Sequence, residues 1–305
     1  MRNILILTLL SLLVTITSLA KENVTIVYSW TAADGPANYS RAIIEEANRL
    51  QNKYNFIFDT KPGAGGSLAA KYVKHTPNTI LATASAFFVR PNFFPNESYE
   101  LDTYREILLQ CTAPIAITAM KYKTWADVPK DQPLTIGVSG LGTTTHLFAT
   151  QIKAKYPQLT IIPFKSTSES LLSVASGNTD LHVAFLGEVE TWGADNPKYG
   201  RLLVLGISGH GSVRGLPTLI SQGFGITVAN ISVPFHLVVP ANISNDKFVE
   251  WRQILVEAGK NPSVKETYKS DACVPGNLTD AELHTWYRNQ IEQWRRISAG
   301  VKITP

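Results

Sequence analysis

The 305-residue sequence has only two cysteines, Cys111 and Cys273, and they lie far apart without the spacing of a metal site. In an oxidising compartment the pair is compatible with one disulfide, and equally with two buried free thiols. The sequence also has no blocks of lysine and arginine. Its net charge is +4, or about +3 once Arg2 leaves with a signal peptide, and the charged residues are spread along the chain. This distribution argues against nucleic acid as a partner.

Beyond its first twenty residues the sequence has no apolar run approaching the ~20 residues that span a bilayer. Residues 1–20 contain an early cation, Arg2, then an apolar core from Ile4 to Val14 and small residues up to Ala20. This is the pattern of a cleavable secretory signal peptide. We therefore expect cleavage near Ala20 and a periplasmic mature chain of ~285 residues, enough for two domains.

A glycine-rich turn at residues 62–67 (PGAGGS) follows the strand-like run 56–58 and leads into a helical run at 68–73. Glycine permits positive φ and close backbone approach, and the first N–H groups of a helix are unpaired. Such a turn can bind an anion at the positive end of the helix dipole. A tight strand-to-helix turn without a ligand is the alternative.

Two series of alternating strands and helices follow one another along the chain, which is typical of α/β folds. The first has strands at 24–28, 56–58 and 79–83 and helices at 38–51 and 67–75. The second has strands at 134–138, 159–162 and 181–185 and helices at 146–156 and 169–176. Polar loops follow several of these strands, and the carboxyl ends of parallel strands are where open α/β sheets bind ligands.

These series predict two Rossmann-like lobes. Two helices at about 245–259 and 279–298 need a sheet to cover, so we expect them to return to the first lobe. Lobe one would then comprise 21–118 plus 233–305, and lobe two 122–230, joined by a two-strand hinge near Ala119 and Ser232. Residues 87–104, rich in Phe, Pro and Asn, are predicted to form a surface excursion.

The segment PGAGGSLAAKYV at 62–73 resembles the signature of the extracytoplasmic solute receptors of tripartite tricarboxylate transporters, the Bug family. Other segments resemble that family in the same order along the chain: 124–128, 137–146, 162–165, 177–180, 201–207 and 214–218. The resemblance extends over about 24 to 304. It implies a periplasmic-binding-protein type II fold whose lobes close on a small carboxylated metabolite and deliver it to a membrane permease, without a cofactor and as a monomer.

The first loop, Ser29 to Ala37, departs from the family pattern, because it has no double glycine and its Asp34 is displaced. For the ligand we expect neutral N–H and hydroxyl donors at helix starts, without a buried cation, since this avoids the desolvation cost of an ion pair. Each hydroxyl has the alternative role of a helix N-cap. The predicted ligand-binding residues are Trp30, Thr31, Gly65, Gly66, Ser67, Ser85, Ser139, Thr143, Thr144, Thr167 and Ser168.

An enzyme is the alternative class of protein, and a secreted hydrolase would need a nucleophile such as Ser139 or Ser208. Neither serine completes a G-x-S-x-G motif, and no histidine pair has the spacing of a metal site. We therefore predict no catalytic residues and no metal. A ligand-sensing protein for a signalling partner would use the same binding site, so the sequence leaves sensing open beside transport.

Overall fold

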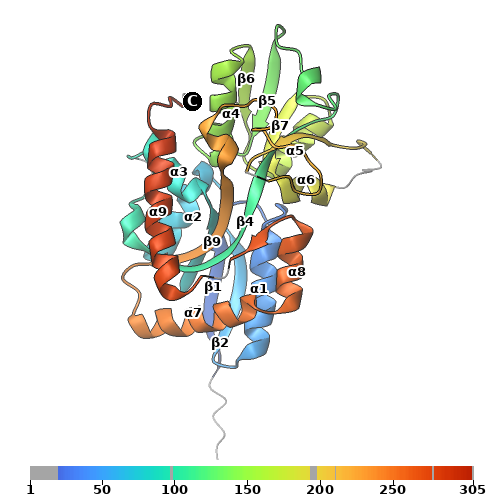
Figure 1. Cartoon of the computed structure of the whole chain (residues 1–305). Helices are drawn as coiled ribbons and strands as arrows, with labels where there is room; N and C mark the ends of the chain where they lie inside the picture. The colour runs from blue at the N-terminus through green and yellow to red at the C-terminus, as the bar shows by residue number, and fades with distance from the viewer. Residues whose placement is uncertain (1–19, 97–98, 193–197, 210, 277, 304–305) are drawn as a thin grey trace, which may run out of the picture.

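The computed structural model describes residues 20–96, 99–192, 198–209, 211–276 and 278–303. The predicted signal peptide, apart from Ala20, lies outside the described residues. Within these ranges the chain has a mixed α/β fold in which ten strands are linked by hydrogen-bonded pairings. Figure 1 shows two halves, one around β1 and β2 and the other around β5 and β6. None of the helices in these ranges is both long and apolar enough to cross a membrane.

The strands and helices near the N-terminus build the first half. They are β1 (Glu22–Tyr28), α1 (Ala37–Leu50), β2 (Tyr54–Thr60), α2 (Ser67–His75), β3 (Thr79–Ala84) and α3 (Ala86–Phe93). The second half contains β5 (Leu134–Val138), α4 (Thr144–Lys155), β6 (Leu159–Pro163), α5 (Thr167–Ala175), β7 (Leu181–Phe185), α6 (Leu186–Trp192) and β8 (Leu203–Ile207). The two predicted α/β series are therefore confirmed.

Two long strands, β4 (Tyr104–Ala119) and β9 (Ser232–Pro240), pair antiparallel with each other and connect the halves. In the first half, β1 is parallel to β2 and β3, and β3 pairs antiparallel with β9. In the second half, β5 is parallel to β6 and β7. β4 pairs with β9 up to Pro114 and with β7 from Ile115 onward, so it changes sheet ahead of the position near Ala119 where we expect the hinge.

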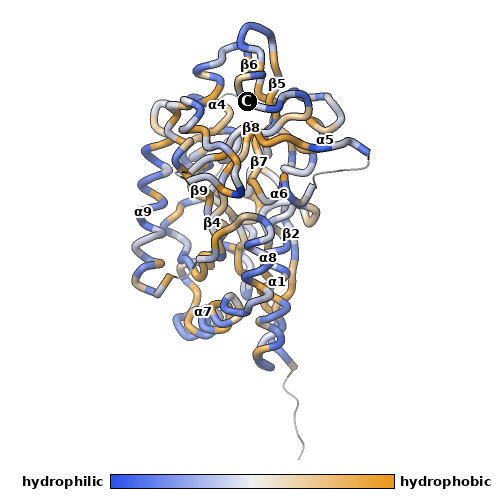
Figure 2. The backbone as a smooth tube through the Cα atoms, turned by 45° about the vertical axis from the view of Figure 1, so that its right-hand side comes forward, coloured by the Kyte–Doolittle hydropathy of each residue, from blue (hydrophilic) through white to orange (hydrophobic). Residues whose placement is uncertain are grey.

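The C-terminal elements pack on the first half, where they cover its sheet (Figure 1). They are α7 (Asn245–Gly259), α8 (Pro262–Ser270), the short strand β10 (Val274–Pro275) and α9 (Asp280–Ser298). A capping box between Thr279 and Glu282 starts α9, and its Trp294 is fully buried. Figure 2 shows that hydrophobic residues gather along interior strands such as β4 and β7, whereas much of α7 is hydrophilic.

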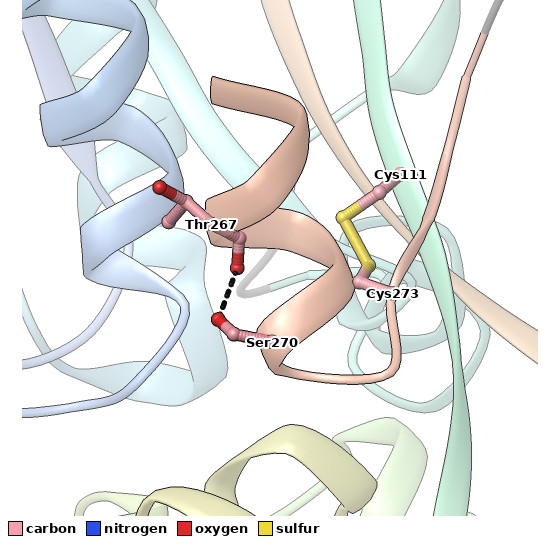
Figure 3. The surroundings of a disulfide bond; sticks show 4 residues. All are labelled: Cys111, Thr267, Ser270 and Cys273. Carbon is pink, nitrogen blue, oxygen red and sulfur yellow. Dashed lines mark hydrogen bonds between the residues drawn. A yellow bond between two sulfur atoms is a disulfide. The ribbon is translucent and has the colours of Figure 1, made fainter. Parts of the chain in front are cut away.

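A disulfide joins Cys111 on β4 to Cys273, just after α8, with their Cα atoms 5.5 Å apart (Figure 3). The pair is separated by 162 residues, so the bond ties the C-terminal segment to β4, one of the two strands that connect the halves. Of the two alternatives that the sequence leaves open, the structure contains the disulfide rather than two free thiols.

One prediction of local structure is wrong. Residues 87–104 are not only a surface excursion, because they include most of α3 and the start of β4. Phe87 and Phe88 are 1% and 0% exposed, and Phe88 stacks on the imidazole of His236 with ring centres 4.9 Å apart. The aromatic side chains that suggested an exposed loop therefore form part of the core. Arg90, on the same helix, is also buried, with 4% of its surface exposed.

Candidate functional site

The glycine-rich turn lies between β2 and α2, as predicted, and approaches the second half of the molecule. Gly63, Gly65 and Gly66 have φ of 131°, 58° and 95°, a region that L side chains adopt only at a cost. A Cβ atom at Gly65 would lie 3.1 Å from the carbonyl oxygen of Leu141, which belongs to the loop after β5. The absence of a side chain at Gly65 therefore permits close contact between the two halves.

The loop after β5 faces this turn and is shaped by its own hydroxyl groups. The Thr143 hydroxyl caps α4 by accepting from the backbone N–H of His146, and the Ser139 hydroxyl lies 2.8 Å from that of Thr145. His146 Nδ1 accepts from the backbone N–H of Gly142 at 3.1 Å. Burial lowers the pKa of His146 to about 4, so the ring is neutral and able to accept this bond at neutral pH. Ser139 and Thr143 thus hold the loop in shape.

Two pairs of polar side chains connect the halves directly. The hydroxyls of Ser85, after β3, and Thr144, at the start of α4, lie 2.6 Å apart, and both residues are buried. Asp34 Oδ1 accepts a hydrogen bond from the Ser168 hydroxyl at 2.7 Å and a longer one from the Ser168 backbone N–H at 3.4 Å. Ser85, Thr144 and Ser168, all predicted ligand-binding residues, therefore lie at the contact between the halves.

Arg90 on α3 adds a cation that the sequence analysis missed. Its Nε donates to the Ser67 hydroxyl at 2.9 Å, and its Nη1 donates to the Leu141 carbonyl oxygen at 2.5 Å, across the cleft. Its guanidinium also lies 4.4 Å from the ring centre of Phe94. The cleft therefore contains a buried cation beside the neutral donors that the sequence predicts, and which of these groups the ligand contacts stays a prediction. The sequence signal that could have indicated a buried Arg90 is its position among aromatic residues, directly after the end of a predicted strand.

Two carboxyl groups lie near the same contact. Burial raises the pKa of Asp34, while its hydrogen bonds from Ser168 oppose that change. Glu188 on α6 accepts from the backbone N–H of Phe185, and burial together with the nearby Asp34 charge raises its pKa well above the usual value. A hydrogen bond from Thr167 to Glu188 acts in the opposite direction. Thr167 thus contacts a buried acid.

The remaining predicted residues lie in the first half. Trp30 is 7% exposed and packs on Tyr28 with ring centres 5.6 Å apart, and its ring lies close to Gly66. Thr31 and Gly65 line a pocket of about 510 Å³ between the glycine-rich turn and the second half. The pocket is also lined by Pro62, Gly63, Ala64, Arg90, Gly140, Leu141, Pro163, Phe164, Lys165 and Glu169. Its volume is that of a small-molecule site. The role of each residue in ligand binding stays a prediction.

The serines considered as nucleophiles are engaged in structural hydrogen bonds. The Ser208 hydroxyl donates to the Ile231 carbonyl oxygen at 2.6 Å and accepts from the backbone N–H of Ile115 at 2.8 Å. A serine and a histidine do meet elsewhere, at Ser170 and His182, but both are 0% exposed, and burial lowers the pKa of His182 to about 3. In the described part of the chain, no group of three or more His, Cys, Asp and Glu side chains is arranged to hold a metal ion.

Comparison with known proteins agrees with this architecture. Structures with the same fold include the periplasmic binding protein BugD, at a TM-score of 0.81 and 19% identity over 92% of this chain and 98% of that one. Another is MatC from Rhodopseudomonas palustris with bound malate, at 0.80 and 16% identity over 90% and 98%. A UPF0065 protein encoded in the gbd 5′ region of Cupriavidus necator is 27% identical over 90% of this chain and 82% of its own length.

The two halves joined by β4 and β9 are thus the two lobes of a periplasmic-binding-protein fold. Residues 41–302 match the sequence profile described as the tripartite tricarboxylate transporter family receptor, and this match covers most of the chain. The chain therefore belongs to the receptor family of the tripartite tricarboxylate transporters.

Proposed function

We propose that the protein captures a small carboxylated metabolite between its two halves and delivers it to the membrane subunits of a tripartite tricarboxylate transporter. The observation that carries this proposal is that Arg90, Ser85 and Thr144 make hydrogen bonds between the two halves, with Arg90 lining the pocket between them. A guanidinium and hydroxyl groups are suitable partners for a carboxylate. A structure with the same fold, MatC, is described with malate bound, which supports a ligand of this class.

Binding would exchange contacts between the halves for contacts with the ligand. The Ser85 to Thr144 bond and the Arg90 to Leu141 bond each join groups from opposite sides of the cleft. A carboxylate that accepts from Arg90 and the hydroxyls would bridge the same two surfaces. Because the ligand then contacts both sides only when they are close together, occupancy favours the closed arrangement.

The test is a thermal-shift screen of mono-, di- and tricarboxylates, including malate and adipate, and of amino acids. A ligand that binds the folded state raises the unfolding midpoint by mass action. For the tightest ligand, Arg90→Gln should weaken binding about tenfold or more, since hydrogen bonds to charged groups contribute roughly 1.5–3 kcal/mol. Arg49→Gln, at a surface pair with Glu46, is the matched control and should bind normally. If no carboxylate stabilises the protein, the proposal fails.

We also propose that 21–118 with 233–305 form one folding unit and 122–230 the other. The position of β9 between β3 and β4, and the packing of α7 and α8 on α1, support this division. A fragment of residues 21–120 would lack both β9 and these helices. We expect it to show no cooperative unfolding transition by circular dichroism, whereas a cooperative transition would contradict the division.

Export to the periplasm is proposed on the pattern of residues 1–20. The N-terminus of the protein recovered from the periplasm should begin at Lys21. Recovery of a chain that begins at Met1 would contradict this proposal.

A further inference from the structure

A second pocket lies in the first half, away from the cleft. It has a volume of about 380 Å³, within the range of small-molecule sites. Its walls come from β4, α7 and α9, and its apolar lining includes Leu108, Leu109, Phe248, Val256 and Leu283. None of the residues that line it contributes to the cleft pocket. The site described above therefore does not explain this cavity.

Tyr268 and Gln110 line the pocket, and each has one buried polar atom, the Tyr268 hydroxyl oxygen and the Gln110 side-chain amide nitrogen. Tyr268 is 1% exposed and Gln110 is 4% exposed, and among the described residues neither atom makes a hydrogen bond of normal geometry. Burial raises the pKa of Tyr268, and the Gln110 side chain lowers it. The two groups are therefore neighbours. Buried donors without partners are rare and costly, so an oxygen atom that accepts from both would stabilise the pocket.

The charged residues at the pocket are already engaged. Arg252 donates to Asp280 at 2.5 Å and to the carbonyl oxygens of Ile107 at 2.6 Å and Leu278 at 3.5 Å. Lys260 pairs with Glu257 at 2.7 Å. A charged ligand would have to break these pairs or enter an apolar cavity without a partner, which is unfavourable. The lining therefore favours an uncharged ligand.

The disulfide holds the two polar groups in place. Cys111 directly follows Gln110 on β4, and the backbone N–H of Cys273 donates to the carbonyl oxygen of Tyr268 at 2.9 Å. The backbone N–H of Gly276 donates to the carbonyl oxygen of Gln110 at 2.9 Å. Figure 3 shows the disulfide between β4 and the segment after α8, so both sides of the pocket are covalently linked. A site fixed in this way is preorganised for binding.

We propose that this pocket is a second binding site, for an uncharged and mainly apolar small molecule whose single hydroxyl or carbonyl oxygen accepts hydrogen bonds from Tyr268 and Gln110. The aliphatic and aromatic side chains of β4, α7 and α9 cover the apolar part of the ligand. The site is independent of the cleft, so the protein would bind two ligands of different chemistry.

The experiment uses 2-naphthol, a fluorescent molecule with an apolar ring system and one hydroxyl, titrated into the mature, oxidised protein. We expect saturable binding at one site that is unchanged by excess malate. Tyr268→Phe removes one hydrogen bond to the ligand and should weaken binding roughly fivefold. Because the hydroxyl makes no hydrogen bond of normal geometry within the described part of the chain, the same variant should keep or raise the unfolding midpoint.

Tyr99→Phe is the matched control. The Tyr99 hydroxyl is also buried in the first half, but it donates to the carbonyl oxygen of Phe87 at 3.0 Å and does not line the pocket. This variant should lower the unfolding midpoint and leave 2-naphthol binding unchanged. Absence of saturable binding, competition by malate, or equal affinity in Tyr268→Phe and the parent protein would each overturn the proposal.

Discussion

Replacing Gly65 by alanine tests whether closure of the cleft determines ligand affinity. A Cβ atom there would lie 3.1 Å from both the Leu141 carbonyl oxygen and Arg90 Nη1, which are themselves hydrogen-bonded to each other. Because Leu141 contributes backbone, the closed arrangement must shift by a few tenths of an ångström. Overpacking of this kind costs about 1–3 kcal/mol. We expect ligand affinity to fall about 5- to 30-fold, as one or two kcal/mol implies.

The strain at this position must be separated from the contact across the cleft. Gly65 has φ 58°, and an alanine in this left-handed region costs roughly 1–2 kcal/mol whether the cleft is open or closed. That cost lowers the unfolding midpoint without changing affinity. Gly177→Ala is the matched control, since Gly177 has φ 77°, does not line the cleft pocket, and a Cβ atom there would meet nothing within 4 Å.

Isothermal titration with the carboxylate that gives the largest thermal shift measures the affinity, and urea unfolding measures the stability. Both variants should lose stability, and only Gly65→Ala should lose more than about threefold in affinity. Unchanged affinity in Gly65→Ala, or an equal loss in Gly177→Ala, would refute the assignment of Gly65 to the closing contact.

Three further predictions concern other contacts. Ser85→Ala removes the hydrogen bond to Thr144 and should weaken ligand binding about fivefold by calorimetry. Adding Thr144→Ala should cause little further loss of affinity, and additive losses would contradict direct coupling of the two hydroxyls. Replacing Cys111 and Cys273 by serine opens a 162-residue loop and should lower the free energy of unfolding in urea by up to about 5 kcal/mol. A loss below about 1 kcal/mol would contradict this expectation. His146 stays neutral when folded, with its pKa lowered to about 4, so its own contribution to stability should fall by about 2 kcal/mol between pH 7 and pH 5 as the unfolded state takes up the proton; the buried His182 adds a similar fall. His146→Asn keeps an acceptor for the loop and should reduce the slope of the urea midpoint between pH 7 and pH 5 without removing the part due to His182. An unchanged slope would count against the assignment.

The position of the candidate site could be predicted from the sequence. Strand-to-helix turns at 62–67 and 139–144 follow parallel strands, and the carboxyl ends of such strands form a common edge in each sheet. The pairing of β4 with β9 and β7 then brings these edges to face each other. The disulfide could not be decided in the same way, because a separation of 162 residues says nothing about distance in space.

The course of residues 86–93 could not be predicted with the same rules. Pro91 and Asn92 are loop-forming residues, and Pro91 lies inside α3. What stabilises the helix is tertiary packing, since Phe87 contacts the rings of Tyr99 and Tyr104 at 4.9 and 5.3 Å. Aromatic contacts of this kind outweigh local propensity. They depend on residues outside the helix, so a local pattern cannot reveal them.

The misreading of α3 explains why the sequence analysis did not place Arg90 at the cleft. An arginine in an exposed excursion would be solvated, whereas the buried Arg90 donates to Ser67 and to Leu141 from the opposite side. Neutral donors at helix starts do occur here, but Ser139 and Thr143 are used to shape their own loop. The turns locate the cleft because they depend on local geometry. The charge available to a ligand depends on which side chains tertiary packing buries, and Arg90 is buried because the aromatic residues beside it form part of the core.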